Sequence, residues 1–173
     1  MVFLLDCRVI QMIKLVIFDA DETLWASYGY WVSLLTPPLT RVDDEIVDSE
    51  GKRITLFRGV RQLLETLRER GILISLVSLN DSEPNRVLEC LELFELRDYF
   101  VYPQVNWGDK GENIRRVLSL LKEKDGINID CSEVLFVDDH ISNIERAKRA
   151  CPGILALHIG RDISRVTEII NYL

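Results

Sequence analysis

The chain has 173 residues, 47% of them hydrophobic, and a formal net charge of −7 at pH 7. This length is enough for a full hydrophobic core, so we expect a single domain over residues 1–173. The negative charge argues against a nucleic-acid partner, because binding a phosphate backbone requires a basic surface. No apolar run approaches the roughly 20 residues that span a bilayer, so we expect no membrane partner either.

The N-terminal stretch is apolar but does not resemble a signal peptide, since it lacks a basic leading segment and a small-residue cleavage site. Met12 directly precedes the first expected strand, so residues 1–11 are either an extension outside the core fold or the result of an upstream start codon. The cysteines are scattered, without a Cys-x-x-Cys pair. We therefore expect buried thiols in a reducing cytoplasm, rather than a disulfide framework or a metal site, at Cys7, Cys90, Cys131 and Cys151.

Short apolar runs alternate with longer amphipathic segments along most of the chain. The apolar runs predict buried strands at residues 14–19, 72–78, 99–103, 132–139 and 153–160. The amphipathic segments predict helices at residues 58–71, 81–94, 111–126, 142–151 and 162–173. For the second helix we expect Asp81 or Ser82 as the cap and Pro84 in the first turn.

Near-continuous apolar strands between helices are typical of a parallel sheet that is covered on both faces. The fold class is therefore α/β, a Rossmann-like three-layer fold with a central parallel sheet of about five strands. Residues 26–57 break this rhythm, because they contain prolines and a turn-like "DSEGKR" at residues 48–53. We expect this segment to be a short flap or hairpin insert, too small for a separate domain.

Polar side chains gather where the expected strands end, which is where ligands bind in parallel α/β sheets. They are Asp19, Asp21, Ser78, Lys110 (at the start of a helix), Asp138 and Asp139. Several carboxylates together form a hard oxygen cage of the kind that suits Mg²⁺. A carboxylate beside the metal can attack phosphorus, and a second one can protonate the leaving oxygen. A hydroxyl, backbone N–H groups and a lysine can bind the phosphoryl oxygens.

Each of these residues alone has an ordinary alternative. An Asp-x-Asp pair is common in turns, Ser78 could be a turn residue, and Lys110 could be a solvated surface lysine. Asp139 or Ser142 could simply cap the following helix. Their occurrence together, each near a strand end, favours a functional site.

Four motifs in order, "DADETLW" (19–25), "LVSLN" (76–80), Lys110 and "FVDDHISN" (136–143), resemble those of the haloacid dehalogenase superfamily. The resemblance covers residues 13–160. More narrowly, "DETLW", "YWV", "TPP", "DSEGKRITLFRGV" and "LELFELRDYF" resemble the magnesium-dependent phosphatases, the protein-tyrosine-phosphatase-like acid phosphatases.

This resemblance implies a role for each matching residue. Asp19 corresponds to the nucleophile and a Mg²⁺ ligand, and Asp21 to the general acid and base that gives its backbone carbonyl to the metal. Asp139 corresponds to the third metal ligand, with Asp138 and Asn143 as outer-shell support.

The remaining motif residues correspond to the phosphate site. Ser78 and Lys110 match the phosphate-binding pair, and the N–H groups of Glu22 and Thr23 are expected to face the phosphate. The family commonly has Arg after the motif-two serine, but this chain has Leu79, followed by Asn80. A bidentate donor is thereby lost, which leaves the substrate preference open.

We expect a Mg²⁺-dependent phosphomonoester hydrolase that acts through an aspartyl-phosphate on a small phosphate ester or a phosphotyrosine-type substrate. Trp31, with Tyr28 and Tyr30, could stack on an aryl or sugar phosphate, or could only pack within the flap. The alternative is a non-hydrolytic phosphotransferase or an acyl-carrier-linked binding module. A dehalogenase would not need Asp21, a phosphomutase usually needs a larger cap, and a signalling receiver carries its acceptor aspartate on a middle strand. We expect a cytoplasmic monomer or weak dimer.

Overall fold

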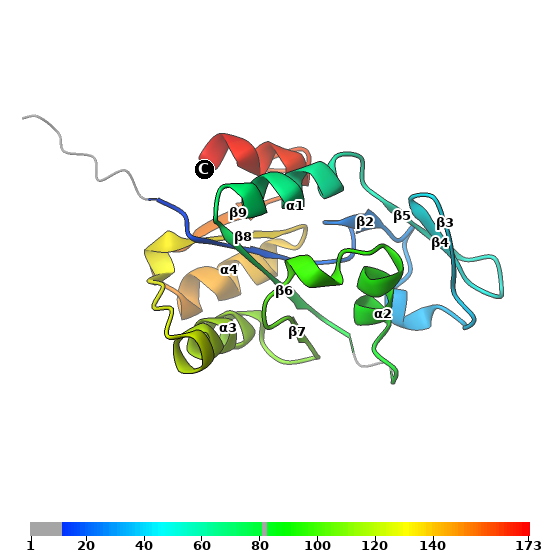
Figure 1. Cartoon of the computed structure of the whole chain (residues 1–173), viewed down its shortest axis with the longest axis horizontal. Coiled ribbons are helices and arrows are strands. Elements are labelled where there is room, and N and C mark those ends of the chain that lie inside the picture. The colour runs from blue at the N-terminus through cyan, green and yellow to red at the C-terminus, as the bar shows by residue number, and fades with distance from the viewer. Residues whose placement is uncertain (1–11, 81–82) are drawn as a thin grey trace, which may run out of the picture.

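The computed structural model describes residues 12–80 and 83–173. A five-stranded parallel sheet forms the centre of the molecule, with the strand order β7-β6-β1-β8-β9 (Figure 1). Its strands are β1 (Leu15–Phe18), β6 (Leu73–Ser78), β7 (Gln104–Val105), β8 (Val134–Asp138) and β9 (Leu155–His158). This arrangement confirms the predicted α/β fold and its parallel sheet.

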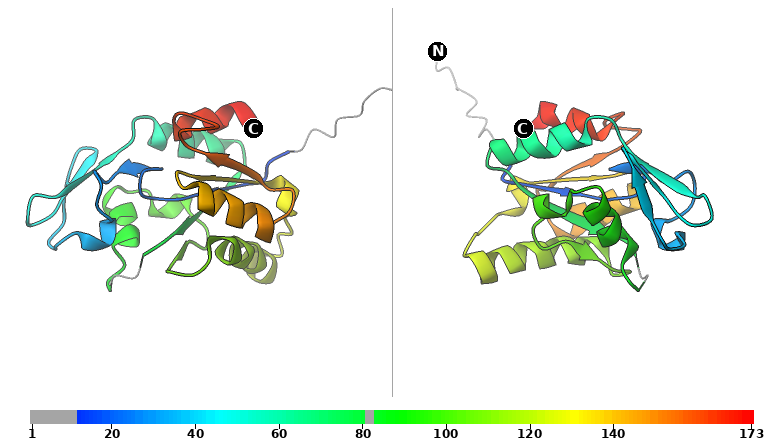
Figure 2. Two further views of the ribbon diagram at one scale, coloured as in Figure 1. Left: turned by 180° about the vertical axis from the view of Figure 1, so that it is seen from behind. Right: turned by 45° about the vertical axis from the view of Figure 1, so that its right-hand side comes forward.

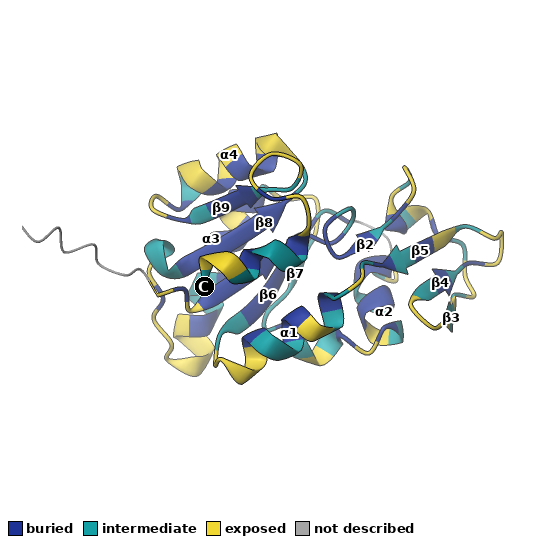
Figure 3. Ribbon diagram, turned by 90° about the horizontal axis from the view of Figure 1, so that it is seen from above, coloured by how far each residue is buried: buried dark blue, intermediate teal, exposed yellow. Residues whose placement is uncertain are grey.

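Helices cover both faces of this sheet, as Figures 1 and 2 show. The helix α1 (Val60–Glu69) and the C-terminal 3-10 helix η4 (Val166–Tyr172) lie on one face, and α3 (Lys110–Asp125) and α4 (Ile141–Ala150) lie on the other. Successive side chains of a strand point to opposite faces. Accordingly, Val16 and Phe18 of β1 pack into the core cluster on the first face, and Leu15 and Ile17 into the cluster on the second. All four are fully buried, and Figure 3 shows the central strands as buried.

A second, antiparallel sheet is inserted after β1, in the order β2-β5-β4-β3. Its strands are β2 (Trp25–Ala26), β3 (Thr40–Val42), β4 (Glu45–Val47) and β5 (Arg53–Leu56), and the 3-10 helix η1 (Val32–Leu34) lies between β2 and β3. Asp48 closes the turn between β4 and β5, because its Oδ1 accepts hydrogen bonds from the N–H groups of Glu50 and Lys52 at 2.9 and 2.7 Å. The expected flap is therefore a small sheet, with its turn at "DSEGKR".

Some element boundaries differ from the expectation. The helix α2 (Arg86–Leu93) begins after Asn85, whose side-chain oxygen accepts a hydrogen bond from the N–H of Leu88 at 3.2 Å. Pro84 therefore precedes the helix instead of lying in its first turn. The other proposed caps, Asp81 and Ser82, lie outside the described residues.

The third predicted strand is displaced toward the C-terminus. Residues 97–99 form the 3-10 helix η2 (Arg97–Tyr99), and the strand β7 begins only at Gln104. Tyr102 interrupts the expected extended run with a φ of 46°, and Pro103 has no N–H to donate to a neighbouring strand. The last segment also differs, since the expected α-helix is the 3-10 helix η4.

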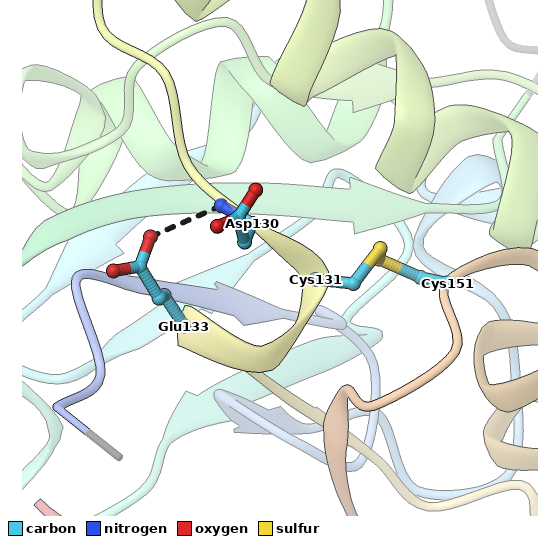
Figure 4. Close-up of a disulfide and its surroundings, with 4 residues drawn as sticks. All are labelled: Asp130, Cys131, Glu133 and Cys151. Carbon is cyan, nitrogen blue, oxygen red and sulfur yellow. Dashed lines mark hydrogen bonds between the residues drawn. A yellow bond between two sulfur atoms is a disulfide. The ribbon is translucent and has the colours of Figure 1, made fainter. Parts of the chain in front are cut away.

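The structure also differs from the expectation that all four cysteines are free thiols. Cys131 and Cys151 form a disulfide with a Cα–Cα distance of 5.3 Å, and Figure 4 shows it beside the 3-10 helix η3 (Cys131–Glu133). Sequence spacing could not reveal this pair, because β8 and α4 lie between the two residues and it is the packing of these elements that places them together. Cys90 is a buried free thiol, as expected, and Cys7 lies outside the described residues.

Persistent disulfides are typical of oxidising environments. We had expected a cytoplasmic location partly because we expected free thiols, and the disulfide removes that argument. The cytoplasmic location stays a prediction. Among the described residues, no helix is both long enough and apolar enough to span a bilayer.

The disulfide closes a loop with a sequence separation of 20 residues. The chain-entropy argument for a loop of this size predicts a loss of about 3 kcal/mol of unfolding free energy when the bond is absent. We expect Cys131→Ser to lower the melting temperature by about 6–12 °C. Dithiothreitol should lower the melting temperature of the wild-type protein by a similar amount and leave that of the variant unchanged. Equal melting temperatures for the reduced and oxidised wild-type protein would contradict this prediction.

Candidate active site

The buried ammonium group of Lys110 lies at the centre of the site. Its Nζ donates hydrogen bonds to Asp19 Oδ1 at 2.5 Å, to Asp138 Oδ2 at 2.8 Å and to the carbonyl oxygen of Val77 at 2.9 Å. The side chain of Lys110 is 1% exposed, and those of Asp19 and Asp138 are 8% and 0% exposed. All three ammonium protons are thus used, and one positive charge is shared between two buried carboxylates.

The local sequence explains how Lys110 reaches this place. Asp109 caps α3, because its Oδ1 accepts a hydrogen bond from the N–H of Glu112 at 3.1 Å, and the helix begins at Lys110. The next residue, Gly111, lies against α4. A Cβ atom added at Gly111 would be 2.5 Å from Ala150 Cβ and 2.8 Å from the carbonyl oxygen of Arg146. The absence of a side chain at Gly111 therefore lets α3 approach α4 closely enough to place Lys110 in the site.

Asp138 is held by hydrogen bonds on both of its carboxylate oxygens. Asn143 Nδ2 donates to Oδ1 and Oδ2 at 3.0 and 3.1 Å, and the N–H of His140 donates to Oδ1 at 2.8 Å. The N-cap of α4 is His140, so the alternative in which Asp139 or Ser142 caps this helix is wrong. Asp138 and Asn143 thus form a rigid support at the end of β8.

The remaining carboxylate of this group is Asp139, which is half-buried. One ligand atom each from Asp19, Asp138 and Asp139 lies within 4.8 Å of the other two. Asp139 Oδ1 is buried and has no hydrogen-bond partner among the described residues. A buried oxygen without a partner is costly unless a further group binds it.

The charges around this cluster also call for a cation. Burial raises the pKa of Asp19 to about 7, although the charge of Lys110 lowers it, and the charge of Asp138 raises it further. Burial likewise raises the pKa of Asp139. Three carboxylates face a single lysine, and a divalent ion with oxygen ligands would keep them ionised. The donor set of hard oxygens fits Mg²⁺.

Asp21 lies near the same strand end but in different surroundings. Its Oδ1 accepts a hydrogen bond from Trp25 Nε1 at 2.7 Å, and its Oδ2 accepts one from the N–H of Val32 at 3.3 Å. Burial raises the pKa of Asp21, whereas the hydrogen bond from Trp25 lowers it. The side chain is thus held by the inserted segment and not by the ammonium group of Lys110.

The turn after β1 differs from the expectation in its backbone contacts. We expected the N–H groups of Glu22 and Thr23 to face a phosphate, but they donate to the carbonyl oxygens of Trp25 and Ala20 at 2.8 and 3.1 Å. Glu22 Oε1 accepts hydrogen bonds from the N–H and hydroxyl of Ser27, both at 2.8 Å. These contacts close the turn on itself, and Glu22 ties it to the base of the insert.

A cavity of about 450 Å³ opens above these groups. Residues from every sequence motif line it, including Asp19, Asp21, Glu22, Trp31, Ser78, Leu79, Lys110, Asp139 and Asn143. Asp138 and Asn80 are buried and do not line this cavity. The structure therefore brings most of the predicted site residues together and places Asp138 beneath them.

Sequence reasoning missed Trp107, which lies in the loop before α3 and also lines the cavity. Its ring centroid is 5.2 Å from that of Trp31 in the insert. Trp31 and Trp107 are 59% and 46% exposed. The position of Trp107, only three residues before Lys110, could have suggested that it lies near the site. Nothing in the sequence showed that the insert would contact this loop.

Comparisons with known proteins agree with this geometry. The family described as Acid Phosphatase matches residues 11–167. Magnesium-dependent phosphatase 1 from Homo sapiens is 32% identical over 148 residues, which cover 84% of this chain and 77% of that protein.

Two solved structures show a similar fold. A haloacid dehalogenase superfamily hydrolase from Ehrlichia chaffeensis has a TM-score of 0.65 at 21% identity, over 93% of this chain and 96% of that chain. The N-terminal part of a Bacteroides fragilis protein, which contains a phosphatase domain and is complexed with Mg, has a TM-score of 0.57 at 22% identity. That match covers 94% of this chain but spans only 39% of the other.

The matched family extends over nearly the whole described sheet, from before β1 to the start of η4. The acidic cluster lies at the sheet edge where such a fold carries its site. The chain therefore belongs to the acid phosphatase family.

Proposed function

We propose that the protein hydrolyses phosphate monoesters, with Asp19 as the nucleophile and Asp21 as the general acid and base. The observation that carries this proposal is the contrast between the two carboxylates. Asp19 is held by the ammonium group of Lys110, whereas Asp21 is held by neutral donors of the insert, Trp25 Nε1 and the N–H of Val32. A pair of carboxylates with different surroundings suits one nucleophile and one proton donor.

In the first step, a carboxylate oxygen of Asp19 attacks phosphorus and forms an aspartyl-phosphate. The bond from phosphorus to the leaving oxygen breaks, and that oxygen takes the proton of Asp21. Ionised Asp21 then takes a proton from water, the hydroxide attacks phosphorus, and the bond to Asp19 breaks to release inorganic phosphate. Bound Mg²⁺, held by Asp19 and Asp139, would offset the negative charges that meet in this reaction.

Ser78 and Lys110 are the residues that we assign to the phosphoryl group. Both are buried at the floor of the cavity, at the end of β6 and the start of α3. The hydroxyl of Ser78 can donate to a phosphoryl oxygen. Lys110 contributes its positive charge, which lowers the pKa of Asp19 against the effect of burial and so favours the ionised form of the nucleophile.

The residues at the mouth of the cavity indicate which leaving groups the site would accept. Tyr28, Trp31 and Trp107 line it and are about half exposed or more, and Leu79 adds a further apolar surface. Among the residues that the structure describes, no arginine lines this cavity, and the buried Lys110 is the one lysine that does. We infer that the site prefers phosphate esters with an aromatic leaving group over those that carry a second anion.

We expect Asp21→Asn to discriminate between leaving groups. A para-nitrophenolate ion leaves without a proton, whereas the alkoxide of an alkyl phosphate needs one. The kcat/KM should therefore fall much more for an alkyl phosphate than for para-nitrophenyl phosphate, and EDTA should abolish turnover of both. Asp19→Asn is the matched control, and it should remove activity on both substrates without a trapped phosphoenzyme. An equal loss on both substrates in Asp21→Asn would contradict the acid role.

We expect Lys110→Met to unfold more easily than the wild-type protein in EDTA. The substitution leaves two buried carboxylates without their cation, which costs about 3–5 kcal/mol for a broken buried pair. Mg²⁺ should recover part of this loss, because it supplies positive charge beside Asp19 and Asp139. Melting temperatures of both proteins, with EDTA and with Mg²⁺, measure the effect. A Mg²⁺-dependent stabilisation no larger in Lys110→Met than in the wild-type protein would count against this electrostatic role.

We expect Trp107→Ala to weaken the use of aryl substrates selectively. Loss of one aromatic contact of about 0.5–1.5 kcal/mol corresponds to a fall of about two- to twelvefold in kcat/KM for para-nitrophenyl phosphate. The kcat/KM for a short alkyl phosphate should stay unchanged. Leu34→Ala is the matched control, because Leu34 is 58% exposed on the insert but does not line the cavity. A parallel fall for both substrates would reject the aromatic preference but leave the phosphatase mechanism standing.

A further inference from the structure

A second cavity, of about 650 Å³, lies outside the catalytic cavity. It is bounded by the start of α1 and the start of η4, which lie side by side over one face of the sheet (Figure 1). Its wall contains an apolar group formed by Phe57, Leu63, Ile159, Val166 and Ile170. Of the described residues, Glu22 is the one that lines both cavities.

The charge of this wall is opposite in sign to that of the protein. Arg58 and Arg165 line the cavity, and Glu22 is the one acidic residue among the described residues of its wall. These lining residues carry a formal charge of +1 in a chain of −7. Arg58 is exposed and forms no ion pair with any residue that the structure describes. Arg165 has only a distant partner, since its Nε is 3.8 Å from Glu168 Oε1. Glu22 is already engaged by Ser27.

Backbone N–H groups add to this positive character. The helix α1 begins at the cavity after Gly59, which has no side chain to cap it and has a φ of 87°. The first turn of α1 contains no acidic residue. The first N–H groups of a helix lack partners within it, and together with the helix dipole they favour an anion.

An independent observation comes from Thr23, which forms part of the same wall. Its side chain is completely buried, and its Oγ1 has no hydrogen-bond partner among the described residues. A buried hydroxyl without a partner costs free energy. The cavity wall therefore includes a residue with a polar group whose hydrogen-bonding capacity the described residues leave unused.

We propose that this cavity is a second ligand site, for an anion with an apolar body. The carboxylate or phosphate group of the ligand would be bound by Arg58, Arg165 and the first turn of α1. Its apolar body would contact Phe57, Ile159 and Ile170. This proposal does not depend on the catalytic roles proposed above, because none of Asp19, Lys110 and Asp139 lines the cavity.

The test uses 4-phenylbutyrate as the carboxylate probe, hexylphosphonate as a phosphate-like probe that cannot be hydrolysed, and neutral 4-phenylbutanamide as the uncharged control. Binding to the full chain is measured by isothermal titration calorimetry in EDTA, so that neither Mg²⁺ nor turnover affects the result. We expect saturable binding of at least one anion, and affinity at least about tenfold weaker for the amide, because hydrogen bonds to charged groups are lost.

Three variants locate the binding. Arg58→Gln should weaken it by about tenfold. Arg161→Gln is the matched control, because Arg161 is also exposed and close to η4 but does not line the cavity. Gln62→Glu places a negative charge in the cavity and in the first turn of α1, where it favours the helix. It should abolish binding while the melting temperature stays the same or rises, so a loss of binding could not be ascribed to unfolding.

Equal binding of the amide and the anions would overturn the proposal, as would full binding by Gln62→Glu. Binding that is lost in Trp107→Ala but kept in Arg58→Gln would place the probe in the catalytic cavity and would equally reject it. Turnover of para-nitrophenyl phosphate by Arg58→Gln should equal that of the wild-type protein. A failure of binding with normal turnover would therefore reject the second site and leave the proposed catalytic function intact.

Discussion

The site depends on one buried positive charge. Lys110 Nζ binds Asp19, Asp138 and the carbonyl oxygen of Val77, and so it joins β1, β6 and β8 through a side chain that begins on α3. Desolvation opposes the charge of a buried lysine, but the two carboxylates outweigh it and raise the pKa of Lys110. The network satisfies every ammonium proton, which is the condition under which a buried charge is tolerated.

The rest of the fold brings the members of this network together. Parallel pairing of β1 with β6 and β8 aligns the carboxyl ends of three strands, so that residues far apart in the sequence share one edge. Helix packing sets the final position, because Gly111 permits the close contact of α3 with α4, the helix that also carries Asn143. The antiparallel insert then supplies the groups that hold Asp21. Asp19, the proposed nucleophile, is thus positioned by the sheet and its helices, and Asp21, the proposed proton donor, by the insert.

Much of this arrangement could be predicted from the sequence. Apolar runs that end in Asp19, Ser78 and Asp138 predict parallel strands, and the carboxyl ends of parallel strands share one edge of the sheet. Local signals were less reliable. The third strand lies at β7, beyond the predicted run, because Tyr102 has a positive φ. Several polar residues before α2 could have capped it, and the sequence did not show that Asn85 is the one that does. The disulfide and the contact between Trp31 and Trp107 each join segments that meet only in the folded chain, so no spacing rule could find them.

The disulfide encloses the part of the chain that carries Asp138, Asp139 and Asn143, since Cys131 precedes β8 and Cys151 follows α4. This segment is therefore a covalent ring within the chain. A protease that cut one peptide bond inside the ring would not release a fragment, because the two pieces would stay linked through sulfur. The acidic edge of the sheet is thus tethered twice, by the backbone and by the disulfide, and the oxidised protein could survive a nick there as one molecule.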